Sequence, residues 1–175
     1  MTYKEFLETK IELATESGFI VDPEKVNKVL KPHQRDAVIW ALKGGRRALF
    51  ESFGLGKTVQ EIEFCHLAAE QCGGRALIVL PLGVKQEFTR DAVDVLGYEK
   101  PEYCRTMEEV EKSTSQIVLT NYERVRDGDI RPEYFIATSL DEASVLRSFG
   151  SKTYQTFLDL SLIHISEPTR QAEIS

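Results

Sequence analysis

A glycine-rich stretch, "ESFGLGKTVQ" at residues 51–60, has the residue types of a phosphate-binding loop. It follows the pattern G-x-x-x-x-G-K-[ST], except that Glu51 occupies the position of the first glycine. Gly54 and Gly56, with Leu55 between them, would let the backbone approach phosphate groups closely. The apolar residues before the loop predict a strand and those after it predict a helix, which is the setting that an anion site of this kind needs.

The last residues of the stretch could bind the phosphates and their metal ion. Lys57 carries a positive charge that can reach the β- and γ-phosphates of a nucleotide, and the Thr58 hydroxyl can hold Mg²⁺. A helix that begins here would add its free N–H groups and its dipole. An ordinary strand–turn–helix with a surface lysine has the same local sequence, so the loop alone leaves two interpretations open.

A second group with chemical potential lies in the stretch "SLDEAS". Asp141 and Glu142 come directly after a predicted strand and before a predicted helix. Ligands of open α/β sheets bind at the carboxyl ends of the strands, where the glycine loop would also lie. There Asp141 could position Mg²⁺ through water, and Glu142 could orient and deprotonate an attacking water. A lone Asp-Glu pair is usually a charge pair favoured by a helix dipole, but the two motifs together predict an ATP site.

Strand-like and helix-like segments alternate along residues 1–159 in a way that would position such a site. The predicted strands are short apolar runs at residues 47–50, 75–81, 116–122 and 133–142. The predicted helices have apolar residues on one face and cover residues 3–14, 22–30, 32–43, 57–72 and 84–97. Glycine pairs stop two of these helices, at residues 44–45 and 73–74. The alternation predicts an α/β fold, a parallel sheet flanked by helices.

The composition predicts a soluble intracellular protein. The 175-residue chain has a formal net charge of −6, and Cys65, Cys72 and Cys104 lack the spacing of a zinc site. Their odd number and the charged N-terminus predict reduced thiols in the cytoplasm. No apolar run approaches the ~20 residues that cross a membrane. The acidic charge does not indicate a nucleic-acid binder, but a local basic groove on an acidic body stays open.

The end of the chain, "LSLIHISEPTRQAEIS" at residues 160–175, resembles a translated sequencing adapter. Residues 160–170 back-translate in one frame into a transposase-type adapter used in library preparation. We therefore expect residues 160–175 to have no place in the fold, with Ile163 and Ile165 on the surface. The alternative is a genuine strand "LSLIHIS" followed by a turn. The predicted boundaries are a helical N-terminal extension at 1–30, a domain at 31–159, and this tail.

Several motifs of the chain, in order, resemble those of superfamily 2 helicases and translocases, in particular the Swi/Snf-like branch and its phage-encoded relatives. The resemblance covers about residues 30–158. "LKPHQRDAVIWAL" is similar to the Q motif, "ESFGLGKT" to the phosphate loop and "LIVLPLGVKQEF" to motif Ia. "IVLTNYERV" is similar to the strand motif before motif II, and "LDEAS" to the DEAD/DEAH box. In this family the loop often begins with an acidic or small residue, as at Glu51, whereas Ser144 replaces the usual final His or Asp.

The resemblance implies a RecA-like P-loop NTPase domain, the first motor domain of an ATP-dependent DNA helicase or translocase. It implies ATP and Mg²⁺ as cofactors, with Gln34 reading the adenine, and a cytoplasmic location in a bacterium or a phage-infected host cell. The partner it implies is DNA, double-stranded in this branch. The residues it implies for contact with the nucleic-acid backbone are Pro81, Leu82, Thr120 and Asn121.

In the intact protein, the catalytic residues that the resemblance implies are Lys57 and Glu142. The family also has a second RecA-like domain with an arginine finger and a motif III after the acidic box, and neither is recognised in this sequence. We therefore expect the chain alone to be inactive. Two other interpretations stay open: a DNA-translocating subunit of a restriction or defence system, and a catalytically idle nucleotide-binding fragment.

Overall fold

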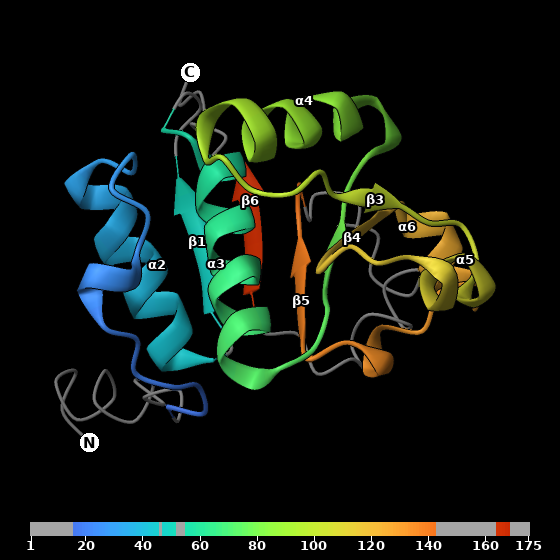
Figure 1. Cartoon of the computed structure of the whole chain (residues 1–175), viewed down its shortest axis with the longest axis horizontal. Helices are drawn as coiled ribbons and strands as arrows, with labels where there is room; N and C mark the ends of the chain where they lie inside the picture. The colour runs from blue at the N-terminus through green and yellow to red at the C-terminus, as the bar shows by residue number, and fades with distance from the viewer. Residues whose placement is uncertain (1–15, 46, 52–54, 143–163, 169–175) are drawn as a thin grey trace, which may run out of the picture.

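The computed structural model describes residues 16–45, 47–51, 55–142 and 164–168 and has a six-stranded parallel sheet at its centre. The strand order is β1-β6-β5-β2-β4-β3 (Figure 1). The strands are β1 (Arg47–Glu51), β2 (Ala76–Val79), β3 (Glu102–Tyr103), β4 (Ile117–Thr120), β5 (Ala137–Leu140) and β6 (His164–Pro168). The α/β fold with a parallel sheet, predicted from the alternation of segments, is confirmed.

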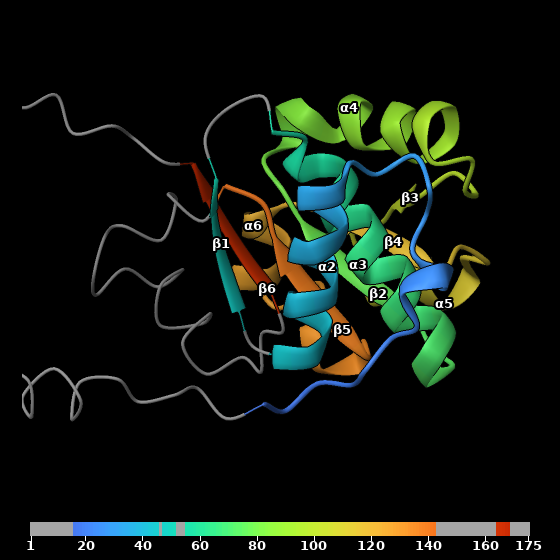
Figure 2. The same ribbon diagram turned by 90° about the vertical axis from the view of Figure 1, so that its left-hand side faces the viewer.

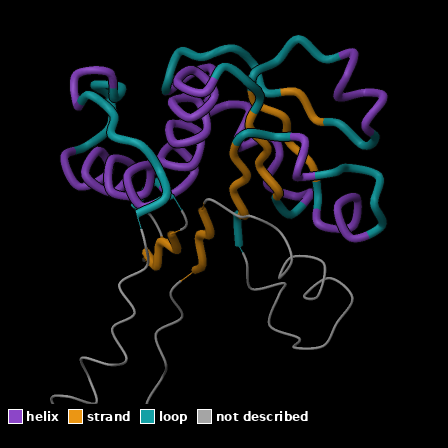
Figure 3. Tube along the Cα trace, turned by 90° about the horizontal axis from the view of Figure 1, so that it is seen from below, coloured by secondary structure: helices purple, strands orange, loops and turns teal. Residues whose placement is uncertain are grey.

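Helices cover both faces of the sheet (Figures 2 and 3). The α-helices are α2 (Pro32–Gly44), α3 (Lys57–Cys72), α4 (Lys85–Arg90), α5 (Met107–Lys112) and α6 (Tyr122–Arg126). The short 3₁₀ turns are η1 (Pro23–Lys25), η2 (Leu82–Val84) and η4 (Pro132–Tyr134), and η3 (Asp91–Val95) is a π-helical segment that continues α4. Among the described helices, none has the length and apolar character needed to cross a bilayer.

The hydrophobic core has two parts, because the side chains of β2 alternate between the faces of the sheet. Ala76 and Ile78 pack with α2, α3 and α4 on one face. Leu77 and Val79 pack with α5 and α6 on the other. All four side chains are inaccessible to solvent. A continuous apolar run is the pattern of a strand buried on both faces, and that prediction is confirmed.

Glycines end two of the predicted helices at the expected positions. Gly45 follows α2 with φ of 76°, and Gly73 follows α3 in the left-handed conformation with φ of 68°. In each case the glycine N–H donates to a carbonyl of the last turn, from Gly45 to Ala41 and from Gly73 to Ala69. The helix ends are therefore encoded locally, by residues that adopt positive φ without a steric cost.

The helix predicted over residues 22–30 is wrong beyond its first turn. Asp22 does accept a hydrogen bond from the Glu24 N–H at 3.0 Å, as an N-cap should, but only the 3₁₀ turn η1 follows. The Asn27 N–H donates to Glu63 Oε1 on α3 at 2.8 Å, and the Asn27 side-chain amide donates to the Leu96 carbonyl at 2.9 Å. Tertiary partners thus take the hydrogen bonds that a continuing helix would have used. The helix predicted over residues 3–14 lies outside the described residues.

Strand β6 contradicts the expectation that the end of the chain has no place in the fold. His164–Pro168 lies between β1 and β5 and pairs in parallel with both; Ile165 is in register with Ala48 and Leu140. Main-chain pairing of this kind depends little on side-chain identity. The strand alternative for "LSLIHIS" therefore fits this segment better, although Ile163 lies outside the described residues. The adapter origin of residues 160–175 stays a prediction about the coding sequence.

Candidate active site

The glycine loop and the acidic pair lie at the same edge of the sheet. Strands β1 and β5 run in the same direction, so their carboxyl ends share one edge. Lys57 begins α3 after the loop that follows β1, and Asp141 comes directly after β5. This arrangement meets the geometric condition that an ATP site requires. Gly54 lies outside the described residues.

Gly56 gives the loop a shape that other residues would distort. It is the N-cap of α3 and is left-handed, with φ of 75° and ψ of 46°. A Cβ at this position would lie 2.4 Å from the Gln34 Nε2 atom. The left-handed backbone conformation therefore favours glycine, and the absence of a side chain lets the Gln34 amide lie close to the loop. An anion could approach the N-terminal N–H groups of α3 without meeting a side chain at this position.

Two glutamines hold the loop from the protein side. The Gln34 Nε2 donates to the Leu55 carbonyl at 2.7 Å, and its Oε1 accepts from the Lys31 N–H at 2.8 Å. The Gln60 Nε2 donates to the carbonyls of Leu55 and Gly56, both at 3.3 Å. Gln34 thus connects the N-terminus of α2 to the loop, and its contact with adenine stays a prediction. The sequence motifs did not indicate Gln60. Its position four residues after Gly56 could have done so, because it places the side chain one helical turn from the loop.

Asp141 lies at the centre of a cluster of charged groups. Burial, which is the largest cause, and the negative charges of Glu142 and Glu87 together raise its pKa from 3.8 to about 6, although the positive charge of Lys57 lowers it. The Thr58 hydroxyl lies 3.5 Å from Glu87 Oε1, at the outer limit of a hydrogen bond. The structure thus brings Lys57, Thr58, Asp141 and Glu142 together and adds Glu87, at the start of α4, which the sequence motifs did not indicate.

Backbone contacts fix the segment that carries the acidic pair. The Asp141 N–H donates to the Val79 carbonyl at 2.9 Å, and the Asp141 carbonyl accepts from the Tyr122 hydroxyl at 2.6 Å. Glu142 follows with φ of 53°, a left-handed conformation that costs a non-glycine residue on the order of 1 kcal/mol or more. The chain therefore turns sharply after β5, and Tyr122 on α6 is a supporting residue with no sequence signal.

A buried polar contact joins the two elements that carry the site. The Ser139 hydroxyl on β5 donates to Glu61 Oε1 on α3 at 2.7 Å, and both side chains are fully buried. A hydrogen bond in the low-dielectric interior is stronger than one at the surface. The contact fixes α3, which starts at Lys57, against the strand that ends before Asp141. Neither residue was singled out in the sequence.

The side chains at this edge fit Mg²⁺ held together with a nucleotide. Within the described part of the chain, no group of three or more His, Cys, Asp or Glu residues could hold a metal ion by itself. Mg²⁺ in nucleotide sites takes one or two protein oxygens and completes its shell with phosphates and waters. The Thr58 hydroxyl and the Asp141 carboxylate supply that number. The pKa of Asp141 is raised mainly by burial and also by the charges of Glu142 and Glu87, and a bound cation would favour its ionised form.

We expect Asp141→Asn to stabilise the fold at neutral and alkaline pH. Because the pKa of about 6 in the folded state lies above the value of about 3.9 in an unfolded chain, protonation of Asp141 favours folding. That contribution is complete below about pH 4 and is lost as the pH rises through 6. The neutral amide should recover up to about 3 kcal/mol at pH 8 and nothing at pH 4.

Urea unfolding of both proteins across this pH range measures the difference directly. Asp36→Asn is the matched control, since Asp36 is exposed on α2 and a surface change of this kind alters stability by less than about 0.5 kcal/mol. Equal stability of Asp141→Asn and the parent chain at pH 8 would contradict the arrangement of Asp141, Glu142 and Glu87 described above.

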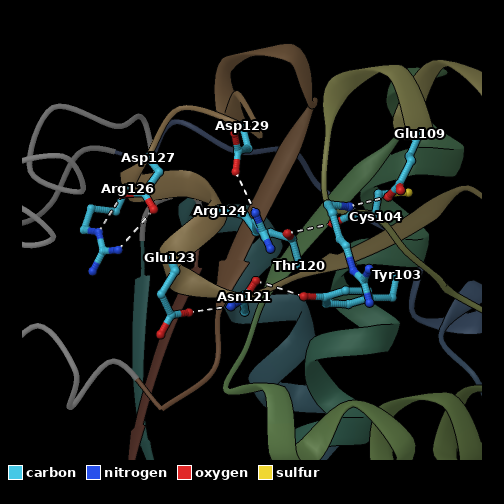
Figure 4. Close-up of polar contacts among 11 residues, drawn as sticks. Tyr103, Cys104, Glu109, Thr120, Asn121, Glu123, Arg124, Arg126, Asp127 and Asp129 are labelled. Atoms are coloured by element: carbon cyan, nitrogen blue, oxygen red, sulfur yellow. Dashed lines mark hydrogen bonds and ion pairs between the residues drawn. The ribbon is translucent and has the colours of Figure 1, made fainter.

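The four residues predicted to contact nucleic acid differ in their exposure. Leu82 is 58% exposed, and Pro81 and Asn121 are partly exposed. Thr120 is fully buried and its hydroxyl donates to the Cys104 carbonyl at 2.9 Å, which joins the end of β4 to the chain after β3 (Figure 4). The structure thus gives Thr120 a structural role and does not support a contact between its side chain and nucleic acid.

No protein-family model matches the chain, and no curated protein matches it either. Solved structures do match in fold. The chain superposes on the Sulfolobus solfataricus SWI2/SNF2 ATPase core in complex with double-stranded DNA with a TM-score of 0.67 and 18% sequence identity. That match covers 90% of this chain and 35% of the Sulfolobus chain.

A similar match is found with the UvsW helicase of bacteriophage T4, with a TM-score of 0.61 and 18% identity, over 96% of this chain and 60% of the helicase. At these identities the likeness establishes the fold alone, which is the RecA-like fold that these two cores share. In both cases the chain spans less than two thirds of the protein that it matches.

Proposed function

We propose that this chain is the nucleotide-binding motor domain of an ATP-dependent DNA helicase or translocase. The observation that carries the proposal is the convergence of Lys57, Asp141 and Glu142 at one edge of a parallel sheet, beside a loop shaped by Gly56. The fold likeness to helicase and SWI2/SNF2 cores supports it. Neither observation alone would be sufficient, because many P-loop proteins share the loop and many folds carry acidic pairs.

Each residue at the edge has a role that follows from its chemistry. The N-terminal N–H groups of α3 and the Lys57 ammonium bind the nucleotide phosphates. Thr58 and Asp141 would hold Mg²⁺, and the ion would supply positive charge against the phosphates. Glu142 lies next to Asp141 and orients the attacking water and accepts its proton. Gln34 and Gln60 keep the loop in the conformation that leaves its N–H groups available.

DNA is the proposed partner of the same edge. The Sulfolobus protein that the chain resembles was solved with double-stranded DNA, and its domain has the same fold. Here Pro81, Leu82 and Asn121 lie after β2 and β4, at the carboxyl edge of the sheet, with at least part of each residue exposed. This placement would let bound DNA contact the loops that follow β2 and β4.

A second domain is proposed to complete the site. The chain covers 35% and 60% of the two proteins described above, so much of each has no counterpart here. A nucleotide held by Lys57 and Asp141 would be contacted from one side only, and a second domain would supply the other side. The same coverage favours a second candidate function, in which this chain binds nucleotide without turning it over.

ATP turnover by the uninterrupted protein, meaning this chain joined to the proposed second domain, tests the proposal when it is measured with and without double-stranded DNA. DNA bound across both domains should close the cleft around the nucleotide, so turnover should rise when DNA is added. The same measurement on single-stranded DNA and RNA identifies the preferred partner. Turnover that does not respond to any nucleic acid would reject the motor function, and absence of nucleotide binding would reject the ATP site itself.

A further inference from the structure

A groove lined mostly by polar and charged residues lies between α4 and the edge strand β3. Figure 1 shows the position of these two elements. Its volume is about 560 Å³, within the range of ligand-binding pockets. The side chains that matter for its chemistry are those of Lys85, Gln86, Thr89, Arg90, Lys100 and Tyr103. None of them belongs to the candidate ATP site or to the residues that the sequence motifs assigned to nucleic acid.

The groove carries an excess of positive charge in an acidic chain. Its cations are Lys85, Arg90 and Lys100, and its one lining anion is Glu102. Asp91 partly neutralises Arg90 through an ion pair of 2.8 Å, and Glu102 accepts a hydrogen bond from the Ser113 hydroxyl at 2.7 Å. Within the described ranges, neither Lys85 nor Lys100 has a carboxylate within ion-pair distance. Two lysines therefore have charge available for an anionic ligand.

Tyr103 connects this groove to the edge of the sheet where nucleic acid is proposed to bind. The Lys85 Nζ lies 4.9 Å from the centre of the Tyr103 ring, a cation–π contact that holds the lysine at the groove. The Tyr103 hydroxyl donates to Asn121 Oδ1 at 2.9 Å (Figure 4). Asn121 in turn donates to Glu123, which fixes the orientation of its amide. Tyr103 thus links the groove to Asn121 through one hydrogen bond.

We propose that this groove binds the sugar-phosphate backbone of a DNA strand and extends the nucleic-acid site from Asn121 to Lys100. The inference rests on the proposed function, because DNA is chosen over other anions on the basis of the groove's link to Asn121 through Tyr103. Lys85 and Lys100 contact phosphates, and Gln86 and Thr89 offer hydrogen-bond donors between them. The contacts involve no base edges, so binding is independent of sequence.

The net charge of the chain makes this groove important for DNA binding. A protein of net charge −6 repels DNA over most of its surface, so local positive charge has to supply the attraction. Each lysine that neutralises a phosphate releases counterions, which appears as a slope of about 0.7 to 0.9 per contact in a plot of log affinity against log salt concentration. Loss of both lysines should therefore reduce this slope by about 1.4 to 1.8.

The test is binding of fluorescein-labelled single- and double-stranded oligonucleotides to this chain, followed by fluorescence anisotropy over a series of salt concentrations. We compare the parent chain with the double variant Lys85→Ala/Lys100→Ala. The matched control is Lys25→Ala/Lys28→Ala, which removes the same charge from a different cavity, next to His66 and Tyr98. Thermal unfolding of each variant checks that the fold is retained.

We expect the groove variant to bind DNA at least tenfold more weakly at low salt and with the smaller slope, whereas the control variant keeps the parent slope. Tyr103→Phe should weaken binding less and leave the slope unchanged, because it removes the bond to Asn121 but no charge. Equal slopes for the groove and control variants would reject DNA binding by the groove but would not affect the proposed motor function. Absence of DNA binding by the parent chain and by the uninterrupted protein would overturn both.

Discussion

Replacement of Glu142 by glutamine is expected to reduce DNA-stimulated ATP turnover of the uninterrupted protein by about 10²–10⁴-fold. Glutamine keeps the shape of the side chain but cannot accept the proton of the attacking water. ATP binding should persist, because the phosphates are held by Lys57 and by the N–H groups of α3. Steady-state ATPase rates, together with binding of a fluorescent ATP analogue, separate the two effects.

Lys57→Ala provides the complementary result. It removes the ammonium group that binds the phosphates, so both nucleotide binding and turnover should be lost.

Glu108→Gln is the matched control for Glu142→Gln, since Glu108 lies on α5 in an exposed ion pair with Lys112 and its replacement should not affect turnover. If the Glu142→Gln protein turns over ATP as fast as the parent, Glu142 is not the base and the motor assignment fails.

The second large effect concerns the side of the nucleotide site that the proposed second domain would supply. This chain alone should hydrolyse ATP at close to the background rate, whereas the uninterrupted protein should be about 10³–10⁵-fold faster with DNA. The estimate is the contribution of a trans-acting arginine in related phosphoryl-transfer systems. The chain should also bind nucleotide weakly, because only one side of the ligand is contacted.

Adding the remainder of the protein as a separate polypeptide gives a direct control. Recovery of turnover on mixing, lost when an arginine of the added part is replaced by alanine, would show that the second part completes the site. DNA-stimulated turnover by this chain alone at the rate of the uninterrupted protein would contradict a site divided between two domains.

Local sequence determined strands β1, β2, β4 and β5, the ends of two helices and the candidate ATP residues. The runs that became β2 and β4 are buried on both faces and consist of apolar residues except for Thr120, a pattern that is visible in a short window of the sequence. Gly45, Gly56 and Gly73 were recognisable because positive φ selects glycine at the position itself. Lys57 and Thr58 follow the loop directly, so their placement at the end of β1 required no information from elsewhere in the chain.

Only the tertiary structure decided which distant residues support the site. Glu87, Tyr122 and the Ser139–Glu61 hydrogen bond act on Lys57 or Asp141 across elements that the sequence keeps far apart. No periodicity indicates them, because one polar residue in a buried position has no local pattern.

The same limit explains the two expectations that the structure corrected. The helix predicted over residues 22–30 does not continue through Asn27, because the Asn27 main-chain N–H donates to Glu63 and its side-chain amide donates to the Leu96 carbonyl. His164–Pro168 pairs with β1 and β5 because main-chain groups form the hydrogen bonds of a parallel sheet, and this pairing depends little on which side chains the strand carries. Strand order and these polar contacts depend on which surfaces meet in three dimensions, and that is settled by packing of the whole chain rather than by any segment of it.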